Sequence, residues 1–221
     1  MQNASIAAFF DFDKTLLATE SSRIGIRYLR QLGMISTPYL LKVVVANFFY
    51  NVRLISDEAL ADVLLTVYRG RRLAEFQEGA ADFYTIHLKP HLAPLLLERL
   101  NWHRHRRHTV VLISGSLRYM LEPVVEDLGI AYLLCSDLEE DRDGRLTGKL
   151  NGRLCMGDHK RYLARRLARE KGLDLKNSYA YGDHHSDLPI LSLVGFPHAV
   201  EPDRPLRRAA RKHQWPILSH R

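Results

Sequence analysis

The sequence predicts an α/β fold in which a parallel sheet lies between two helical layers and a helical insertion follows the first strand. Two observations predict it. Short apolar runs alternate with helical apolar patterns through most of the chain, which is typical of parallel sheets with right-handed crossovers. The segment 18–90 breaks this rhythm. A length of 221 residues suits one such domain with an insertion, or two small domains.

The first strand is expected at Ile6–Phe10, a continuous apolar run that ends at Asp11. Such a run is typical of a strand buried on both faces of a parallel sheet. Further strands are expected at 109–113, 131–135, 178–181 and 198–200. Helices are expected between and after them, at 117–128, 159–171, 187–194 and 204–213.

The insertion is predicted to be helical throughout. Ser56 precedes two acids, a pattern that indicates a helix N-terminus. An apolar stripe at helical spacing comprises Leu73, Phe76, Ala80 and Phe83. A segment of more than 70 residues is too long for a loop. We therefore expect a catalytic core formed by 1–17 and 91–221, and a helical cap formed by 18–90 over the carboxyl edge of the sheet.

Two further segments have a distinct pattern. The apolar stretch 39–50 is expected to form the core of the cap, and it is too short to span a bilayer, which needs about 20 residues. The alternative is a slot for a lipid phosphate, or shallow contact with a membrane surface. The turn signals Asp143-Gly144 and Asn151-Gly152 predict a small β-hairpin around 145–150.

The net charge of +7 and the pI of about 9.5 favour anionic partners without choosing among them. The basic segments 104–108 and 204–212 are interpreted as solvated helix surface, with a nucleic-acid patch at 102–108 as the alternative. Cys135 and Cys155 belong to no metal-binding pattern and are expected to be reduced thiols. No signal-peptide pattern is recognised, so a cytoplasmic protein is expected.

Four segments carry candidate chemistry: Asp11–Thr15, Ser114–Ser116, Lys160 and Gly182–Asp187. Three of them directly follow an expected strand. Ligands bind at the carboxyl ends of parallel strands, so these segments are expected to share one crevice. Its carboxylates would repel one another unless a cation lies among them, and oxygen ligands favour Mg²⁺.

The residue types suggest roles in phosphoryl transfer. Asp11 is placed to attack phosphorus and form an aspartyl-phosphate, and Asp13 to act as general acid and then general base. Lys160 and the metal would neutralise charge on the phosphoryl group, while Ser114 and nearby backbone N–H groups hold its oxygens. Each residue alone also has an ordinary structural interpretation as a turn acid, a helix cap or a solvated lysine. The order and spacing together favour the catalytic one.

At these residues the chain resembles the haloacid dehalogenase superfamily of phosphohydrolases, in its phosphoserine-phosphatase-like branch (subfamily IB). The resemblance implies a Rossmann-like core with a helical cap. It implies Asp11 as nucleophile, Asp13 as acid/base, and Mg²⁺ held by Asp11, the carbonyl of Asp13 and Asp183. Asp187 would support the metal site. Phosphate or substrate binding is expected of Ser114, Gly115, Lys160, Thr15 and Glu20.

Some residues depart from the pattern of that branch and leave the substrate open. Lys14 stands where a small residue is usual, and His184-His185-Ser186 replaces Gly-x-Asn. The two histidines are expected to line the mouth of the site or to stack outside it, rather than to bind zinc. Glu20 resembles the acid that reads a substrate amine, and its alternative is a helix N-terminal acid. One of four cap arginines is a candidate for binding a substrate carboxylate: Arg53, Arg69, Arg71 and Arg72.

The leading hypothesis is a Mg²⁺-dependent phosphomonoester hydrolase of a small phosphorylated metabolite, with phosphoserine or a similar amino-alcohol phosphate as first guess. The alternatives are a lipid or lysolipid phosphate phosphatase, phosphotransfer to an alcohol, and an inactive basic module that binds nucleic acid. The leading hypothesis expects no nucleic-acid partner, no transmembrane segment, and a monomer or homodimer.

Overall fold

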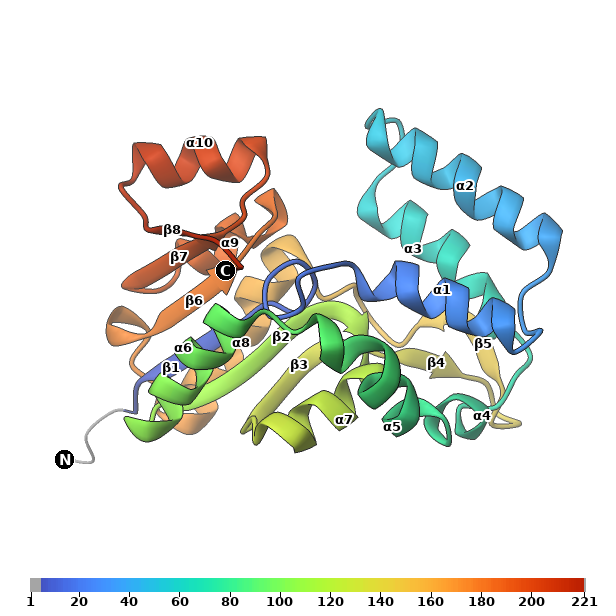
Figure 1. The fold of residues 1–221 in the computed structure, drawn as a ribbon, viewed down its shortest axis with the longest axis horizontal. Helices are drawn as coiled ribbons and strands as arrows, with labels where there is room; N and C mark the ends of the chain where they lie inside the picture. The colour runs from blue at the N-terminus through green and yellow to red at the C-terminus, as the bar shows by residue number, and fades with distance from the viewer. Residues whose placement is uncertain (1–4, 221) are drawn as a thin grey trace.

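The computed structural model describes residues 5–220 and shows a six-stranded, entirely parallel sheet with helices on both faces (Figure 1). In their order across the sheet, its strands are β3 (Tyr132–Ser136), β2 (Thr109–Leu117), β1 (Ala7–Phe10), β6 (Tyr179–Gly182), β7 (Phe196–Val200) and β8 (Ile217–Leu218). The five predicted strands are confirmed. The edge strand β8 was not predicted, because two residues are too few to form a pattern.

Side chains of β1 alternate between two cores, which places the sheet between two helical layers. Ala8 and Phe10 belong to one core and Ala7 and Phe9 to the other, and all are fully buried. The first core includes residues of α6 (Pro94–His105) and α7 (Arg118–Leu128). The second includes residues of α8 (Gly157–Lys171), α9 (Leu188–Leu191) and α10 (Arg204–Lys212). The three-layer prediction is therefore confirmed.

The segment 18–90 is helical, as predicted. Its α-helices are α1 (Ser21–Gln31), α2 (Thr37–Asn51), α3 (Asp57–Leu65), α4 (Ala74–Gln77) and α5 (Ala80–Phe83). Ser56 caps α3 by accepting a hydrogen bond from the backbone N–H of Ala59 at 3.2 Å. Short turns complete the chain: η1 (Thr66–Tyr68), η2 (Tyr84–Leu88), η3 (Lys89–His91), η4 (Leu175–Asn177) and η5 (His185–Asp187). The division of the chain into a core and a separate cap domain stays a prediction.

The expected hairpin is present and hydrogen-bonds the helical segment 18–90. Its antiparallel strands are β4 (Leu138–Glu140) and β5 (Leu146–Leu150). The backbone N–H of Leu146 donates to the carbonyl of Arg71, and the N–H of Gly70 donates to the carbonyl of Leu146, both at 2.8 Å. These bonds extend the hairpin onto the loop after η1, so the hairpin and the helical segment 18–90 are held together.

The expectation that 39–50 forms the core of the cap is wrong for the outer face of α2. Leu41, Val44 and Phe48 are 65%, 65% and 62% exposed, whereas Ala46 on the inner face is buried. The inner face packs on α3, and α2 lies at the outer edge of the molecule (Figure 1), where no described element covers its other side. Within residues 5–220, no helix combines the length and the apolar character that crossing a bilayer requires.

The basic segment 102–108 is only partly the solvated helix end expected. Arg104, Arg106 and Arg107 are exposed, but His103 is fully buried. Its ring hydrogen-bonds the ring of His108 at 2.8 Å and the hydroxyl of Tyr181 at 2.9 Å. Burial lowers the pKa of His103 to about 3, with His108 acting in the same direction, so this ring is an uncharged part of the core.

Candidate active site

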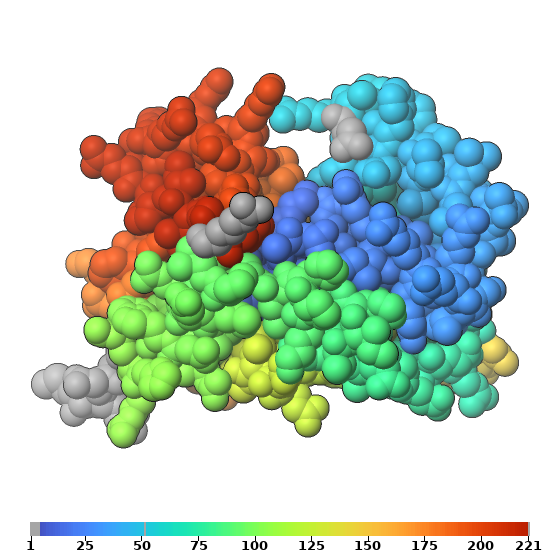
Figure 2. All heavy atoms as spheres, viewed as in Figure 1, coloured from blue at the N-terminus to red at the C-terminus, as the bar shows by residue number. Residues whose placement is uncertain are grey.

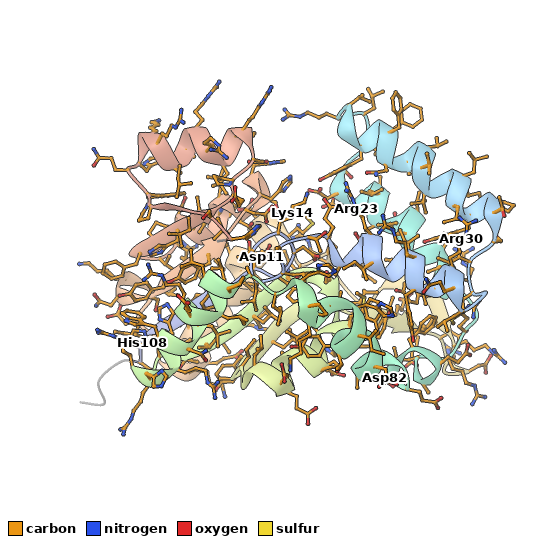
Figure 3. The ribbon with its side chains drawn as sticks, in the orientation of Figure 1. Asp11, Lys14, Arg23, Arg30, Asp82 and His108 are labelled. Atoms are coloured by element: carbon orange, nitrogen blue, oxygen red, sulfur yellow. The ribbon has the colours of Figure 1, made fainter. Side chains whose placement is uncertain are left out.

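The structure brings the candidate segments together at the carboxyl edge of the sheet. Asp11 follows β1 and Asp183 follows β6, and these two strands are neighbours. Carboxylate oxygens of Asp11, Asp183 and Asp187 lie within 4.8 Å of one another, and all three residues are buried. Figure 3 shows Asp11 between the sheet and the helices of segment 18–90, and Figure 2 shows a hollow in the surface between α10 and the helices α2 and α3.

Lys160 is the cation of this cluster. It lies in the first turns of α8 and is 3% exposed. Its ammonium donates to Asp11 Oδ1 at 2.6 Å and to Asp187 Oδ1 at 2.7 Å. Burial lowers the pKa of Lys160, but the two carboxylates outweigh it and hold this pKa above its ordinary value. The lysine is therefore charged and fixes the position of the candidate nucleophile.

The carboxylate of Asp13 points to a different set of partners. The Ser116 hydroxyl donates to Asp13 Oδ2 at 2.6 Å, and the backbone N–H of Ser21 donates to Oδ1. Burial raises the pKa of Asp13, while these hydrogen bonds lower it. Sequence analysis did not identify Ser21 as a hydrogen-bond partner of Asp13. Its position at the start of a helix, where backbone N–H groups are free, is the signal that indicates it.

The expected phosphate-binding residues surround this edge. Ser114 is 1% exposed, and its Oγ accepts a hydrogen bond from the N–H of Ser116 at 3.1 Å. A Cβ added at Gly115 would lie 3.2 Å from Met156 Cγ, so a larger residue fits poorly here. The hydroxyl of Thr15 lies 3.5 Å from Asp183 Oδ1, which places Thr15 against a carboxylate in this structure.

The electrostatics of the cluster fit a bound divalent cation. Burial raises the pKa of Asp11 to about 7 and that of Asp183 to about 9, and the neighbouring carboxylates add to both effects. Lys160 bonds Asp11 and Asp187, while the contact of the Asp183 carboxylate within residues 5–220 is the long one with Thr15. One ammonium therefore pairs with two of the three carboxylates and leaves the cluster with excess negative charge. An oxygen-only donor set with excess negative charge suits a hard ion such as Mg²⁺.

Asp187 is held by close packing against the end of β6. A Cβ added at Gly182 would lie 2.7 Å from Asp187 Cβ, closer than real contacts allow. The backbone N–H of His184 donates to Asp187 Oδ2 at 3.2 Å. The glycine and the aspartate five residues later thus form one unit, and the glycine is required by the close approach.

Glu20 is already paired in this structure. It forms ion pairs with Lys14 and with Arg23, so two cations flank the carboxylate that was expected to read an amine. Lys14 itself adopts the left-handed backbone conformation, with φ of 53°. In this structure the carboxylate of Glu20 is thus paired with two cations, and its role in reading a substrate amine stays a prediction.

His184 and His185 both contact Asp203. His185 Nδ1 lies 2.8 Å and His184 Nε2 3.6 Å from Asp203 Oδ2. Together these three residues form a second group of potential metal ligands. Asp203 is the N-cap of α10 and accepts hydrogen bonds from the N–H groups of His185 and Leu206. Stabilisation of this loop accounts for the arrangement.

The chain belongs to the haloacid dehalogenase-like hydrolase family, whose model matches residues 8–192. A histidinol-phosphatase from Neisseria meningitidis is 29% identical over 96% of this chain and 97% of its own. The phosphoserine phosphatase SerB1 from Mycobacterium tuberculosis is 31% identical over 97% of this chain and 71% of its own.

Among solved structures, a protein of unknown function from Bordetella pertussis superposes with a TM-score of 0.87 at 24% identity, over 98% of this chain and all of its own. A substrate-bound phosphoserine phosphatase superposes with a TM-score of 0.71 at 18% identity, over 100% of this chain and 95% of its own. These likenesses show the fold. With the sequence relatives and the family match, they define the chain as an enzyme, a phosphatase of the phosphoserine-phosphatase-like branch.

Proposed function

We propose that this phosphatase is a Mg²⁺-dependent phosphomonoester hydrolase that forms an aspartyl-phosphate on Asp11. The observation that carries the proposal is the buried cluster in which Lys160 bonds both Asp11 and Asp187, while Asp183 forms no ion pair with any residue that the structure describes. Such a cluster is poorly stable alone and suits a cation together with the dianionic phosphoryl group that the cation would neutralise.

The reaction follows from the positions of the two aspartates of the first loop. A carboxylate oxygen of Asp11 attacks phosphorus, and the bond from phosphorus to the alcohol oxygen breaks while Asp13 gives that oxygen its proton. Water then attacks the aspartyl-phosphate, its proton passes to Asp13, and inorganic phosphate leaves. The raised pKa of Asp13, caused by burial, favours the protonated form that the first step needs.

Asp11, Asp183 and the backbone carbonyl of Asp13 would hold Mg²⁺, with Asp187 in support. The ion supplies charge neutralisation for the phosphoryl oxygens. Lys160 contributes a fixed positive charge beside Asp11, and Ser114 with the neighbouring N–H groups contributes hydrogen bonds to the phosphoryl group.

For the substrate, phosphoserine or a similar amino-alcohol phosphate remains the first compound to assay, and relatives that bear phosphoserine and histidinol phosphatase names support a small phosphomonoester. A second candidate, a lipid or lysolipid phosphate, is favoured by the exposed apolar face of α2. The intact acids at the site argue against a non-catalytic nucleic-acid-binding module. The cytoplasmic location and the oligomeric state stay predictions.

The test is turnover of p-nitrophenyl phosphate by the purified protein. The proposal expects hydrolysis with Mg²⁺, loss of hydrolysis with EDTA, and recovery when Mg²⁺ is restored. The variant Asp11→Asn is expected to lose activity by several orders of magnitude while keeping its fold. Turnover that persists in EDTA, or in Asp11→Asn, would contradict it.

A further inference from the structure

An apolar cavity adjoins the candidate general acid. It has a volume of about 140 Å³ and lies between α1, α3 and the end of β2. Most of its wall is made of aliphatic, methionine and tyrosine side chains from these elements and from α2, η1 and α7, among them Ile26, Leu65, Tyr68 and Met120. Ser21 and Ser116 form part of the lining.

The serines connect the cavity to the chemistry. Both donate a hydrogen bond to the carboxylate of Asp13, Ser116 through its hydroxyl and Ser21 through its backbone N–H. If Asp13 protonates the departing alcohol oxygen, the rest of the alcohol must extend from a point beside this carboxylate. This cavity is therefore positioned to receive the leaving group.

The cavity offers no opposite charge to a charged leaving group. None of the described residues that line it is acidic or basic, so the four cap arginines considered for a substrate carboxylate are not among them. Its tyrosine hydroxyls already have partners: Tyr39 donates to the carbonyl of Leu64 at 2.8 Å, and Tyr68 bonds Tyr119 at 2.8 Å. An ammonium or carboxylate placed there would lose hydration without gaining an ion pair, whereas an apolar group would gain by burial.

We propose that the substrates of this phosphatase are phosphate monoesters whose leaving alcohol carries an apolar group, buried in this cavity during the transfer to Asp11. The volume of about 140 Å³ is close to that of engineered cavities of about 150 Å³ that hold benzene. A ring of that size or a short alkyl chain fits. This inference rests on the proposed function and replaces the amino-alcohol phosphate as the preferred substrate class.

The first test compares kcat/KM for methyl, ethyl, propyl and butyl phosphate. These alcohols have similar acidity, so differences report burial of the chain. Each methylene is expected to raise kcat/KM about fourfold, the equivalent of ~0.8 kcal/mol per buried CH₂. Phosphoserine and phosphoethanolamine, which match the longer esters in size but carry charges, are expected to be poorer substrates than propyl phosphate. A flat alkyl series, or phosphoserine as the better substrate, would overturn the proposal.

The second test fills the cavity from α3, with a matched control on the cap surface. Ala61 lines the cavity, and Ala61→Leu is expected to lower the ratio of kcat/KM for butyl over methyl phosphate at least tenfold. Ala81 on α5 is exposed and does not line it, so Ala81→Leu is expected to keep the ratio of the unaltered protein. Equal ratios in both variants would contradict the assignment.

Calorimetry with non-hydrolysable phosphonates separates the failure of this inference from the failure of the proposed function. Butylphosphonate is expected to bind the unaltered protein more than tenfold more tightly than methylphosphonate in the presence of Mg²⁺. If no phosphate ester is hydrolysed but this difference is found, the reaction is wrong and the cavity assignment stands. If esters are hydrolysed and both phosphonates bind equally, the cavity assignment is wrong.

Discussion

Neutralising Asp183 is expected to stabilise the metal-free protein, because its carboxylate is buried beside two others and forms no ion pair of its own within residues 5–220. The folded-state pKa is about 9 against an ordinary 3.8, and burial is the main cause. For an acid with a raised folded-state pKa, stability falls as pH rises from 3.8 towards 9. Because pH 7 lies about 3 units above 3.8, Asp183 lowers the free energy of unfolding at pH 7 by up to ~4 kcal/mol, at 1.36 kcal/mol per unit.

The variant Asp183→Asn removes this penalty but keeps a buried polar group, so a gain of about 2 to 4 kcal/mol is expected in EDTA. This corresponds to a rise in Tm of roughly 4–16 °C for a chain of this size. Saturating Mg²⁺ should stabilise the unaltered protein, by about 2.7 kcal/mol at a hundredfold excess over Kd, and the variant much less.

The assay is thermal unfolding at pH 7 in EDTA and in Mg²⁺. The control is Asp82→Asn, which neutralises an exposed acid on α5 and is expected to shift neither curve appreciably. A variant less stable than the unaltered protein in EDTA would refute the crowding argument. An equal Mg²⁺-dependent shift in both proteins would refute the assignment of Asp183 as a metal ligand.

Three further predictions follow from single contacts. Lys160→Met leaves Asp11 and Asp187 without their ammonium, so the free energy of unfolding, measured by denaturant titration, should fall by about 3–5 kcal/mol and activity should be lost. The control is Arg161→Met, which breaks the surface pair with Asp158 and should change this free energy by at most about 1 kcal/mol. His103 has a folded-state pKa of about 3, so stability should fall by up to ~1.4 kcal/mol per pH unit below 6.5, and His103→Phe should flatten this part of a plot of Tm against pH. Gly182→Ala would press on Asp187, and a loss of about 1–3 kcal/mol with reduced kcat is expected; unchanged kcat would show that this packing does not position the site.

The parts of the fold that could be predicted are those in which the local pattern and the tertiary environment agree. Ile6–Phe10 is apolar throughout because β1 is covered on both faces, and its end at Asp11 sets the edge where the site forms. The placement of Asp183 could be predicted because the carboxyl ends of parallel strands lie at the same edge of a sheet, and β6 pairs with β1 in parallel.

Other features depend on contacts that no local pattern encodes. The stretch 39–50 is apolar enough for a core, but whether its outer face is covered depends on the number of neighbouring helices, and α2 has none there in the described chain. His103 looked like part of a basic surface, yet its burial depends on Tyr181 from a distant strand. The cavity beside Asp13 could not be predicted either, because its wall combines residues from several separate elements.

The central claim is that Asp11 carries the phosphoryl group during turnover. Its direct test is acid quenching of the protein during hydrolysis of p-nitrophenyl phosphate, followed by mass spectrometry of its peptides. The account predicts one added phosphoryl group on the peptide that contains Asp11. This group should be absent from the Asp11→Asn variant and from reactions run in EDTA before the quench. A phosphoryl group on any other residue, or rapid turnover by Asp11→Asn, would contradict it.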